Sequence, residues 1–373
     1  MNRDLEAEAA ATLPVTILTG FLGSGKTTVL NHLLSQPELK DAAVLINEYG
    51  EVAIDHLLVR QVAEDVVLLD SGCLCCTVRG DLVDALRDLF LKKVKGEIPD
   101  FTRVVIETTG LADPAPIVHT LMTDPLLAAR YRLDGLVCTV DAVNGLATLE
   151  RNKESVKQAA MADRLLLTKL DLADPGKAEA LRARLVDINP GALLVPVAEG
   201  RVPPAEVLDC GLFTGKSKTP DVERWLNEEA YAARDEAEHA CGPDCGHEHH
   251  HHHDHHHGHH HHAHRHDDGV ASFVLTYDEP VAWDGLAMAL EFLISTRGEN
   301  LLRVKGIVNA RGNAQPLVIH GVQHMFHPVV PLPEWPDDDH RTRIVFITRD
   351  LPRAAIETLL AHALAEAEAS GQA

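Results

Sequence analysis

The chain has 373 residues, a formal net charge of −22 at pH 7 and seven cysteines. This length can bury a sizeable core and favours two domains. The excess of carboxylates excludes nucleic acid and anionic membranes from the expected partners. The sequence has neither a signal-peptide pattern nor an apolar run long enough to cross a membrane, so we expect a cytoplasmic protein.

Residues 1–12 are acidic and alanine-rich and predict a disordered tail. From residue 13 to 205, short apolar runs alternate with stretches of helical periodicity. The predicted strands are 15–19, 42–46, 66–69, 103–106, 135–140, 165–168 and 193–195, and the clearest helices are 28–34, 81–91 and 178–186. This alternation predicts an α/β domain with a mostly parallel sheet and helices on both faces, which binds ligands at the carboxyl ends of its strands.

Residues 206–269 predict a flexible linker that carries a histidine-rich, metal-binding tract. Fifteen of the 24 histidines lie between residues 247 and 266, just after Cys241 and Cys245. Neutral imidazoles bind divalent ions weakly and at many sites, which is typical of a metal-collecting arm. A purification tag is the alternative interpretation, but the tract is internal and is interrupted by acidic residues and glycine.

Residues 270–373 predict a smaller α+β domain. Its predicted strands are 271–276, 301–308, 316–319 and 341–346, and its predicted helices are 283–294 and 352–365. Three histidines near the end of the chain, His320, His324 and His327, are candidate metal ligands. We interpret them as core or surface residues, which is the commoner role of isolated histidines.

Residues 20–27 match the phosphate-binding loop pattern G-x-x-x-x-G-K-[ST] at every fixed position. The backbone N–H groups of such a loop surround a di- or triphosphate, and the following helix directs its positive end at the same phosphates. Lys26 places a charge near the outer phosphates, and the Thr27 hydroxyl can ligate Mg²⁺. The predicted nucleotide-binding residues of this segment are Gly20, Gly23, Ser24, Gly25, Lys26, Thr27 and Thr28. A simple glycine-rich turn is disfavoured, because an apolar strand precedes the loop and a helical pattern follows it.

Glu107 follows the apolar run 104–106, and Gly110 lies three residues later. A carboxylate at a strand end suits the outer coordination shell of Mg²⁺, and the Gly110 N–H can bind a γ-phosphate and release it after cleavage. This motif alone is weak evidence for a nucleotide-binding site, and it becomes stronger evidence because a phosphate-binding loop is also present. With Lys26 and Thr27, these two residues are the predicted catalytic set.

Lys169 and Asp171 follow a further buried run. Asp171 can accept hydrogen bonds from guanine N1–H and its 2-amino group, a donor pair that adenine lacks. Lys169 can lay its stem over the base. The common GTPase pattern has Asn where this chain has Thr168. An ordinary exposed Lys–Asp loop is the alternative.

Cys73, Cys75 and Cys76 lie within four consecutive positions, which does not resemble a disulfide framework. Thiolates at this density suit Zn²⁺ first, then Co²⁺ or Cu⁺, and three of them leave one tetrahedral position open. Further candidate ligands nearby are Glu48, Glu51 and His119. Buried structural thiols and a redox pair are the alternatives.

These motifs resemble the CobW-type P-loop GTPases, a family that includes zinc metallochaperones and YjiA-like proteins. The resemblance rests on residues 20–28, 47–51, 73–76, 107–110 and 168–171, and in the C-terminal part on 303–306 and 321–324. It implies a P-loop NTPase-type domain over 13–205 and a CobW-type C-terminal domain over 270–373. Some relatives carry an acidic metal ligand at the position of Ile46.

The resemblance also implies a GTPase that uses GTP and Mg²⁺, holds a metal ion at the cysteine motif and delivers it to a client metalloprotein or metal-insertion enzyme. Zinc is the favoured metal. The alternatives are a cobalt chaperone for cobalamin biosynthesis and a metal-storage protein with a regulatory nucleotide site, and a homodimer is a further partner to consider. A kinase or ligase with structural zinc fits less well, because structural zinc sites usually draw four ligands from paired motifs.

Overall fold

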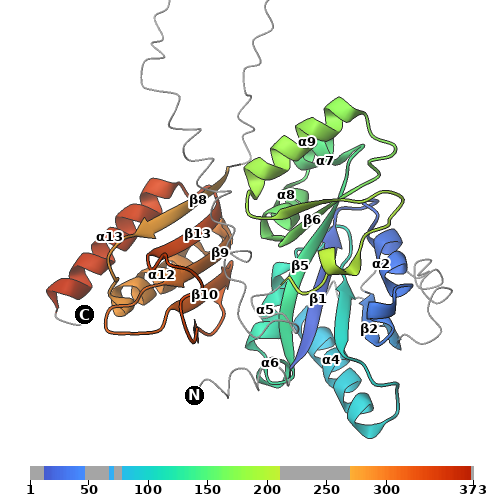
Figure 1. Cartoon of the computed structure of the whole chain (residues 1–373), viewed down its shortest axis with the longest axis horizontal. Coiled ribbons are helices and arrows are strands. Elements are labelled where there is room, and N and C mark those ends of the chain that lie inside the picture. The colour runs from blue at the N-terminus through green and yellow to red at the C-terminus, as the bar shows by residue number, and fades with distance from the viewer. Residues whose placement is uncertain (1–11, 47–66, 71–77, 211–268, 371–373) are drawn as a thin grey trace, which may run out of the picture.

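The structure is a computed structural model that describes residues 12–46, 67–70, 78–210 and 269–370. Within these residues the chain forms two sheets, each with its own helices (Figure 1). The first sheet is parallel and has the strand order β3-β2-β4-β1-β5-β6-β7. The second is antiparallel, with the order β11-β10-β9-β13-β8 and with β12 paired to β10. The predicted α/β class with a smaller α+β domain is confirmed.

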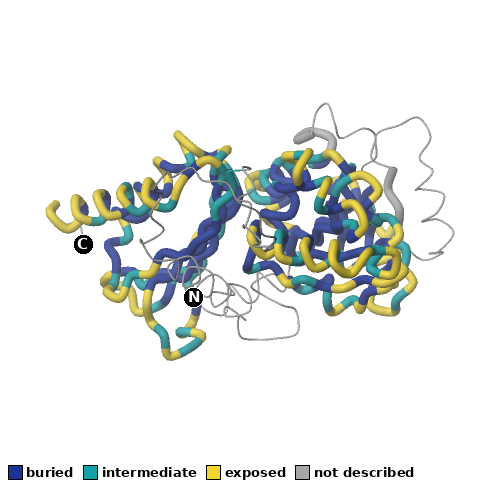
Figure 2. The backbone as a smooth tube through the Cα atoms, turned by 90° about the horizontal axis from the view of Figure 1, so that it is seen from above, coloured by how far each residue is buried: buried dark blue, intermediate teal, exposed yellow. Residues whose placement is uncertain are grey.

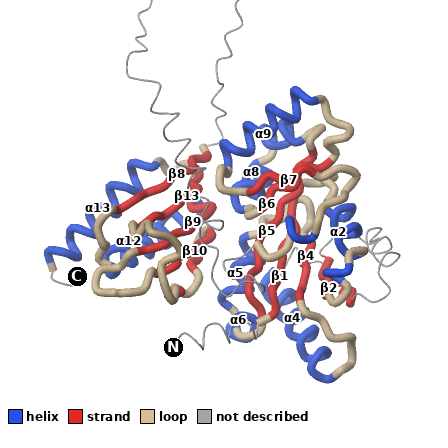
Figure 3. Tube along the Cα trace, in the orientation of Figure 1, coloured by secondary structure: helices blue, strands red, loops and turns tan. Residues whose placement is uncertain are grey.

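The first sheet consists of β1 (Leu13–Gly20), β2 (Ala42–Ile46), β3 (Val67–Asp70), β4 (Arg103–Glu107), β5 (Tyr131–Asp141), β6 (Arg164–Thr168) and β7 (Leu193–Pro196). Its α-helices are α2 (Lys26–Leu34), α4 (Val78–Lys95), α5 (Ala115–Thr123), α6 (Pro125–Ala128), α7 (Gly145–Arg151), α8 (Lys153–Met161) and α9 (Pro175–Ile188). Short 3₁₀ turns cover Pro37–Leu39 and Pro204–Glu206. Strands and helices alternate along most of this chain, as Figure 3 shows.

The second sheet consists of β8 (Val270–Tyr277), β9 (Leu301–Val308), β10 (Leu317–Val322), β11 (Met325–Phe326), β12 (Val330–Pro331) and β13 (Thr342–Arg349). Helices α12 (Trp283–Arg297) and α13 (Arg353–Ala369) accompany it, with a 3₁₀ turn at Gly298–Asn300.

Alternate residues of the parallel strands face two different helical layers. Ile17 and Ile106 lie in a core cluster with residues of α4, α5, α8 and α9, whereas Leu18 and Val105 lie in a second cluster with α2. Residues that point to opposite faces alternate along a strand with period two, so an all-apolar strand is covered on both sides. β1, β2, β9 and β13 accordingly consist almost wholly of buried residues, and buried segments fill the interior of both domains (Figure 2).

The second sheet is also covered on both faces. Val304 and Phe346 pack with α12 and α13, whereas Ile307 and Val345 join the core cluster of the first domain. Helices α5, α8 and α9 contact β10, β9 and β8 respectively. The two domains therefore share an apolar interface formed by one face of the second sheet.

A charged cluster is buried within this interface. Asp163, which precedes β6, accepts hydrogen bonds from Arg303 and from Lys305 Nζ at 3.0 Å, and its second oxygen accepts the Leu136 N–H at 2.9 Å. Burial by itself raises the pKa of Asp163, but the two cations and the backbone donor outweigh it and hold that pKa well below its usual range. Asp163 is therefore an ionised link between the domains.

Two histidine rings of the second sheet, His320 and His327, stack next to this cluster with their centroids 4.3 Å apart. Burial, together with the smaller effect of the Arg303 charge, lowers the pKa of His327 to about 3. The folded protein therefore keeps His327 neutral, as expected for a core histidine.

We predict that acidification below pH 6.5 destabilises the protein partly through His327. The unfolded chain protonates this ring near its ordinary pKa of about 6.5, whereas the folded protein does so only near 3, so the free energy of unfolding falls as the pH falls between these values. Urea midpoints at pH 7.5 and 5.0 measure this, and His327→Phe, which retains a stacked ring, should show a smaller drop than wild type. Equal drops would contradict the assignment.

Candidate nucleotide-binding site

The loop between β1 and α2 contains glycines in backbone conformations that other residues rarely adopt. Gly23 and Gly25 have φ values of 71° and 93°, in the left-handed region, and Gly25 caps α2. A Cβ atom on Gly20 would lie 2.3 Å from Thr139 Oγ1, so β5 closes against the loop. Ser24 is buried and hydrogen-bonds Thr139 through their side-chain oxygens at 2.6 Å.

The side chains of Lys26 and Thr27 are held by hydrogen bonds at the start of α2. Lys26 Nζ donates to the carbonyl oxygens of Gly20 and Phe21, at 3.0 and 3.3 Å, and so lies inside the loop. The Thr27 hydroxyl donates to Glu107 Oε1 at 2.8 Å. A hydroxyl and a buried carboxylate side by side are the hard oxygen donors that suit Mg²⁺.

The segment after β4 lies directly against the phosphate-binding loop. The Thr108 N–H donates to Leu18 O at 2.9 Å, and its hydroxyl donates to Thr19 Oγ1 at 2.9 Å. A Cβ on Gly110 would lie 2.6 Å from the Leu22 backbone nitrogen. Only glycine allows this approach, which brings the segment at Gly110 next to the phosphate-binding loop.

The segment after β6 is tied to the same loop. Thr168, which stands where the common pattern has Asn, donates its hydroxyl to Ser24 O at 2.6 Å. Lys169 Nζ donates to Gly23 O at 2.7 Å and to Asp141 Oδ2 at 2.8 Å. Asp171 is exposed, two residues beyond Lys169. Its place at the end of β6 is compatible with contact to a bound base.

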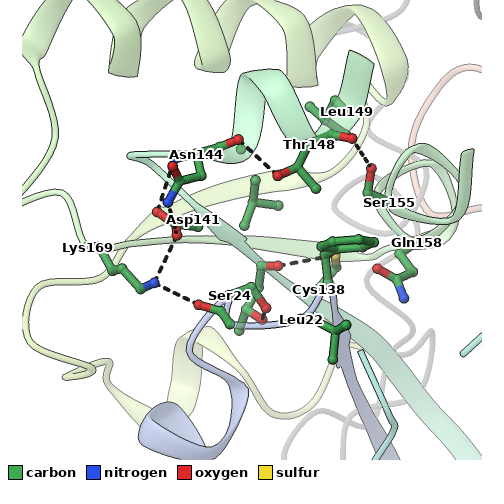
Figure 4. A pocket seen from close by; sticks show the side chains of 15 residues that line it. Leu22, Ser24, Cys138, Asp141, Asn144, Thr148, Leu149, Ser155, Gln158 and Lys169 are labelled. Carbon is green, nitrogen blue, oxygen red and sulfur yellow. Dashed lines mark hydrogen bonds and ion pairs between the residues drawn. The ribbon is translucent and has the colours of Figure 1, made fainter. Parts of the chain in front are cut away.

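Asp141, at the end of β5, was not singled out from the sequence. Burial raises its pKa, but hydrogen bonds from Lys169 and Asn144 outweigh this effect and lower it. The ionised carboxylate thus fixes the Lys169 ammonium, as Figure 4 shows. In the sequence, Asp141 directly follows the apolar run 135–140, and this pattern could have predicted a polar group at the end of a strand.

A cavity of about 220 Å³ lies between the phosphate-binding loop and helices α7 and α8. It is lined by Leu22, Cys138, Thr148, Ser155 and Gln158, among others (Figure 4). The segment after β7 also lies close to α2. A Cβ on Gly200 would lie 2.6 Å from the methyl group of Thr28, which is exposed. This segment therefore lies at the same carboxyl end of the sheet as the phosphate-binding loop.

The predicted transition-metal ligands Cys73, Cys75, Cys76, Glu48 and Glu51 lie outside the described residues, as does the histidine-rich tract. His119 is described and lies on α5, where its Nδ1 is 3.3 Å from the Thr123 hydroxyl. Among the described residues, no group of three or more His, Cys, Asp or Glu side chains is arranged to hold a metal ion. Cys138 is buried.

Comparison with known proteins agrees with this architecture. Residues 14–196 match the family model described as CobW/HypB/UreG, nucleotide-binding domain, and residues 270–364 match the cobalamin synthesis protein cobW C-terminal domain. The chain belongs to the CobW family. The two matched ranges contain both sheets except for Leu13, and they leave out residues 197–269 between the sheets.

Two CobW-family relatives match over almost their whole length. The zinc chaperone YjiA of Escherichia coli is 34% identical over 349 residues, covering 94% of this chain and 98% of the relative. The zinc chaperone CobW of Pseudomonas aeruginosa is 31% identical over 396 residues, covering 98% and 95%. The crystal structure of zinc-bound YjiA GTPase from E. coli superimposes with a TM-score of 0.66 and 28% identity, covering 94% of this chain and 98% of that one.

No helix among the described residues is long and apolar enough to span a membrane.

We predict that Gly20→Ala lowers stability more than Gly23→Ala. The added Cβ at Gly20 would lie 2.5 Å from the Thr139 carbonyl oxygen, whereas at Gly23 nothing lies within 4 Å. Both substitutions carry a left-handed backbone cost, but overpacking at Gly20 adds about 1–3 kcal/mol. Thermal unfolding of both variants measures the difference, and equal melting temperatures would show that β5 does not close against the loop.

Proposed function

We propose that this protein is a GTP-hydrolysing metallochaperone that binds zinc at Cys73, Cys75 and Cys76 and delivers it to a client protein. The observation that carries the nucleotide part is the pairing of Thr27 with Glu107 beside Lys26, inside a glycine-rich loop. The metal part is supported by relatives named zinc chaperones and, in fission yeast, a zinc-regulated GTPase metalloprotein activator.

The residues of the site would act on GTP as follows. The loop's N–H groups and Lys26 bind the β- and γ-phosphates, and Thr27 with Glu107 holds Mg²⁺, which neutralises charge on the phosphate oxygens when bound. Water adds to the γ-phosphorus while the bond to the β–γ bridging oxygen breaks, giving GDP and phosphate. The Gly110 N–H loses its phosphate acceptor, and the segment after β4 is released.

Guanine selection falls to Asp171, which accepts two donors from the base, while Lys169 is held by Asp141 and Gly23 O. Thr168 takes the place of Asn by anchoring the loop through Ser24 O.

Metal release is proposed to follow nucleotide state. Glu48 and Glu51 lie in sequence between β2 and β3, and the cysteine motif lies between β3 and α4; β2 is the strand that pairs with β4. GTP binding orders the segment 47–55 and brings the cysteine motif into a metal-holding geometry, and hydrolysis loosens it at the client. A ligand can shift such an equilibrium only if its affinity differs between the two states.

We predict that Lys26→Ala lowers GTP hydrolysis by about 100-fold or more, since it removes the charge that stabilises the transition state. Phosphate release from GTP and from ATP is measured on full-length protein, and wild type should prefer GTP. An exposed lysine, Lys40→Ala, serves as the control for a lost positive charge. Normal turnover in Lys26→Ala would remove the phosphate-loop assignment.

We predict that a non-hydrolysable GTP analogue raises zinc affinity by about tenfold over GDP, a coupling of about 1.4 kcal/mol. Competition titrations with Zn²⁺ and Co²⁺ are made on a chain lacking residues 241–266, so that weak sites of the histidine tract do not contribute. A larger gain for cobalt would favour the cobalt chaperone. Equal metal affinity in both nucleotide states would favour a storage protein.

A Cys75→Ser, Cys76→Ser variant is the matched control for that titration. This variant should lose the zinc site whose affinity depends on the bound nucleotide, and it should keep any other zinc site. A solved structure of a YjiA variant with a glutamate and two cysteines replaced is itself described as zinc-bound, so residual binding is to be expected in this control. A nucleotide-sensitive site that survives both serine substitutions would move the metal away from the cysteine motif.

A further inference from the structure

Gln158 on α8 holds the segment that contains Gly110. Its side chain is 0% exposed, and its Nε2 donates to Ala112 O at 2.9 Å and to Gly110 O at 3.3 Å. Both hydrogen bonds join α8 to backbone carbonyl oxygens of this segment. The carbonyl of Gly110 is thus fixed by Gln158, which also fixes the orientation of the peptide groups around it.

A second residue of α8 contacts the end of the same segment. Lys157 forms an ion pair with Asp113, and Asp113 Oδ1 accepts the Ala115 N–H at 3.0 Å, where α5 begins. Adjacent residues of one helix therefore hold three positions of the segment between β4 and α5.

The C-terminal domain contacts α8 at both ends. Arg349 of β13 donates to Lys153 O at 3.2 Å, at the first residue of the helix. Arg303 of β9 donates to Met161 O, at the last residue, and the same guanidinium binds Asp163. One short helix is therefore fixed to the second sheet at its ends and to the Gly110 segment at its middle.

The space around Gln158 allows the Gly110 segment and α8 a second arrangement. Its Oε1 is buried and has no hydrogen-bond partner among the described residues, which costs free energy. Gln158 also lines the cavity beside the phosphate-binding loop, together with Leu22 and Ser155 (Figure 4). A shift of the segment or of α8 into this space can offer Oε1 a donor.

We propose that Gln158 is a positioning residue for the phosphate-sensing Gly110 segment and that α8 transmits the position of this segment to the C-terminal domain. This inference rests on the proposed function, because it assumes that Gly110 contacts the γ-phosphate. With γ-phosphate bound, the Gly110 peptide and Gln158 adopt one arrangement; after its loss they adopt the other, and α8 carries the change to Arg303 and Arg349.

The first experiment measures affinities for GDP and for a non-hydrolysable GTP analogue, with Mg²⁺, on full-length protein. Gln158→Met keeps the length of the side chain and removes the donor. It should lower analogue affinity by about tenfold while GDP affinity changes by less than about twofold. Ser155→Ala is the control, because Ser155 lines the same cavity on the same helix but donates only within α7–α8, to Thr148 O and Asn152 O.

An analogue-to-GDP affinity ratio in Gln158→Met within twofold of wild type overturns the positioning role. GDP affinity and the melting temperature report whether the variant folds. If Gln158→Met does not fold, Lys157→Gln, at a partly exposed position, breaks the ion pair to Asp113 and should lower the same ratio. An unchanged ratio in that variant also counts against the proposal.

The second experiment follows amide hydrogen exchange of α8 and β9 in the GDP and analogue states. Wild type should show a difference between states in both elements, and Gln158→Met should abolish the difference in β9. Identical β9 exchange in both wild-type states overturns transmission. Absence of GTP hydrolysis by wild type would contradict the proposed function itself, whereas normal hydrolysis with an unchanged ratio in the variants contradicts only this inference.

Discussion

The close approach of the segment after β4 to the phosphate-binding loop is the constraint on which the rest of the site depends. It requires glycine at Gly110, because a Cβ there would overlap the Leu22 backbone. Register places the two strand ends together, with Leu18 of β1 opposite Glu107 of β4. Thr27 can therefore reach Glu107.

The C-terminal sheet is covered on both faces over much of its area. One face packs on α12 and α13, and the other packs on helices of the first domain. Arg303 and Lys305 can be buried there only because Asp163 is ionised between them. Breaking such a pair on one side leaves an uncompensated charge, so the domains are held in a specific relative position.

The departure of Thr168 from the common Asn has a local explanation. Its hydroxyl reaches Ser24 O, so it anchors the phosphate-binding loop from the end of β6 without a longer side chain. Lys169 reaches the same loop from the next position, and Asp141 at the end of β5 fixes it. The ends of β5 and β6 thus act on one loop, because the strands of a parallel sheet end on the same side.

The sequence by itself determined the elements and motifs that local patterning encodes: the apolar strands, the loop at 20–27 and the resemblance to the CobW family. It did not extend β5 back to Tyr131, because Arg132 and Asp134 interrupt the apolar run; Asp134 is buried there only because Thr16 and the Asp209 N–H bind it. The sequence around Gln158 likewise contains no pattern that predicts its contacts. Only the tertiary structure decided the roles of Asp134 and Gln158, because the residues that they contact lie far away in the chain.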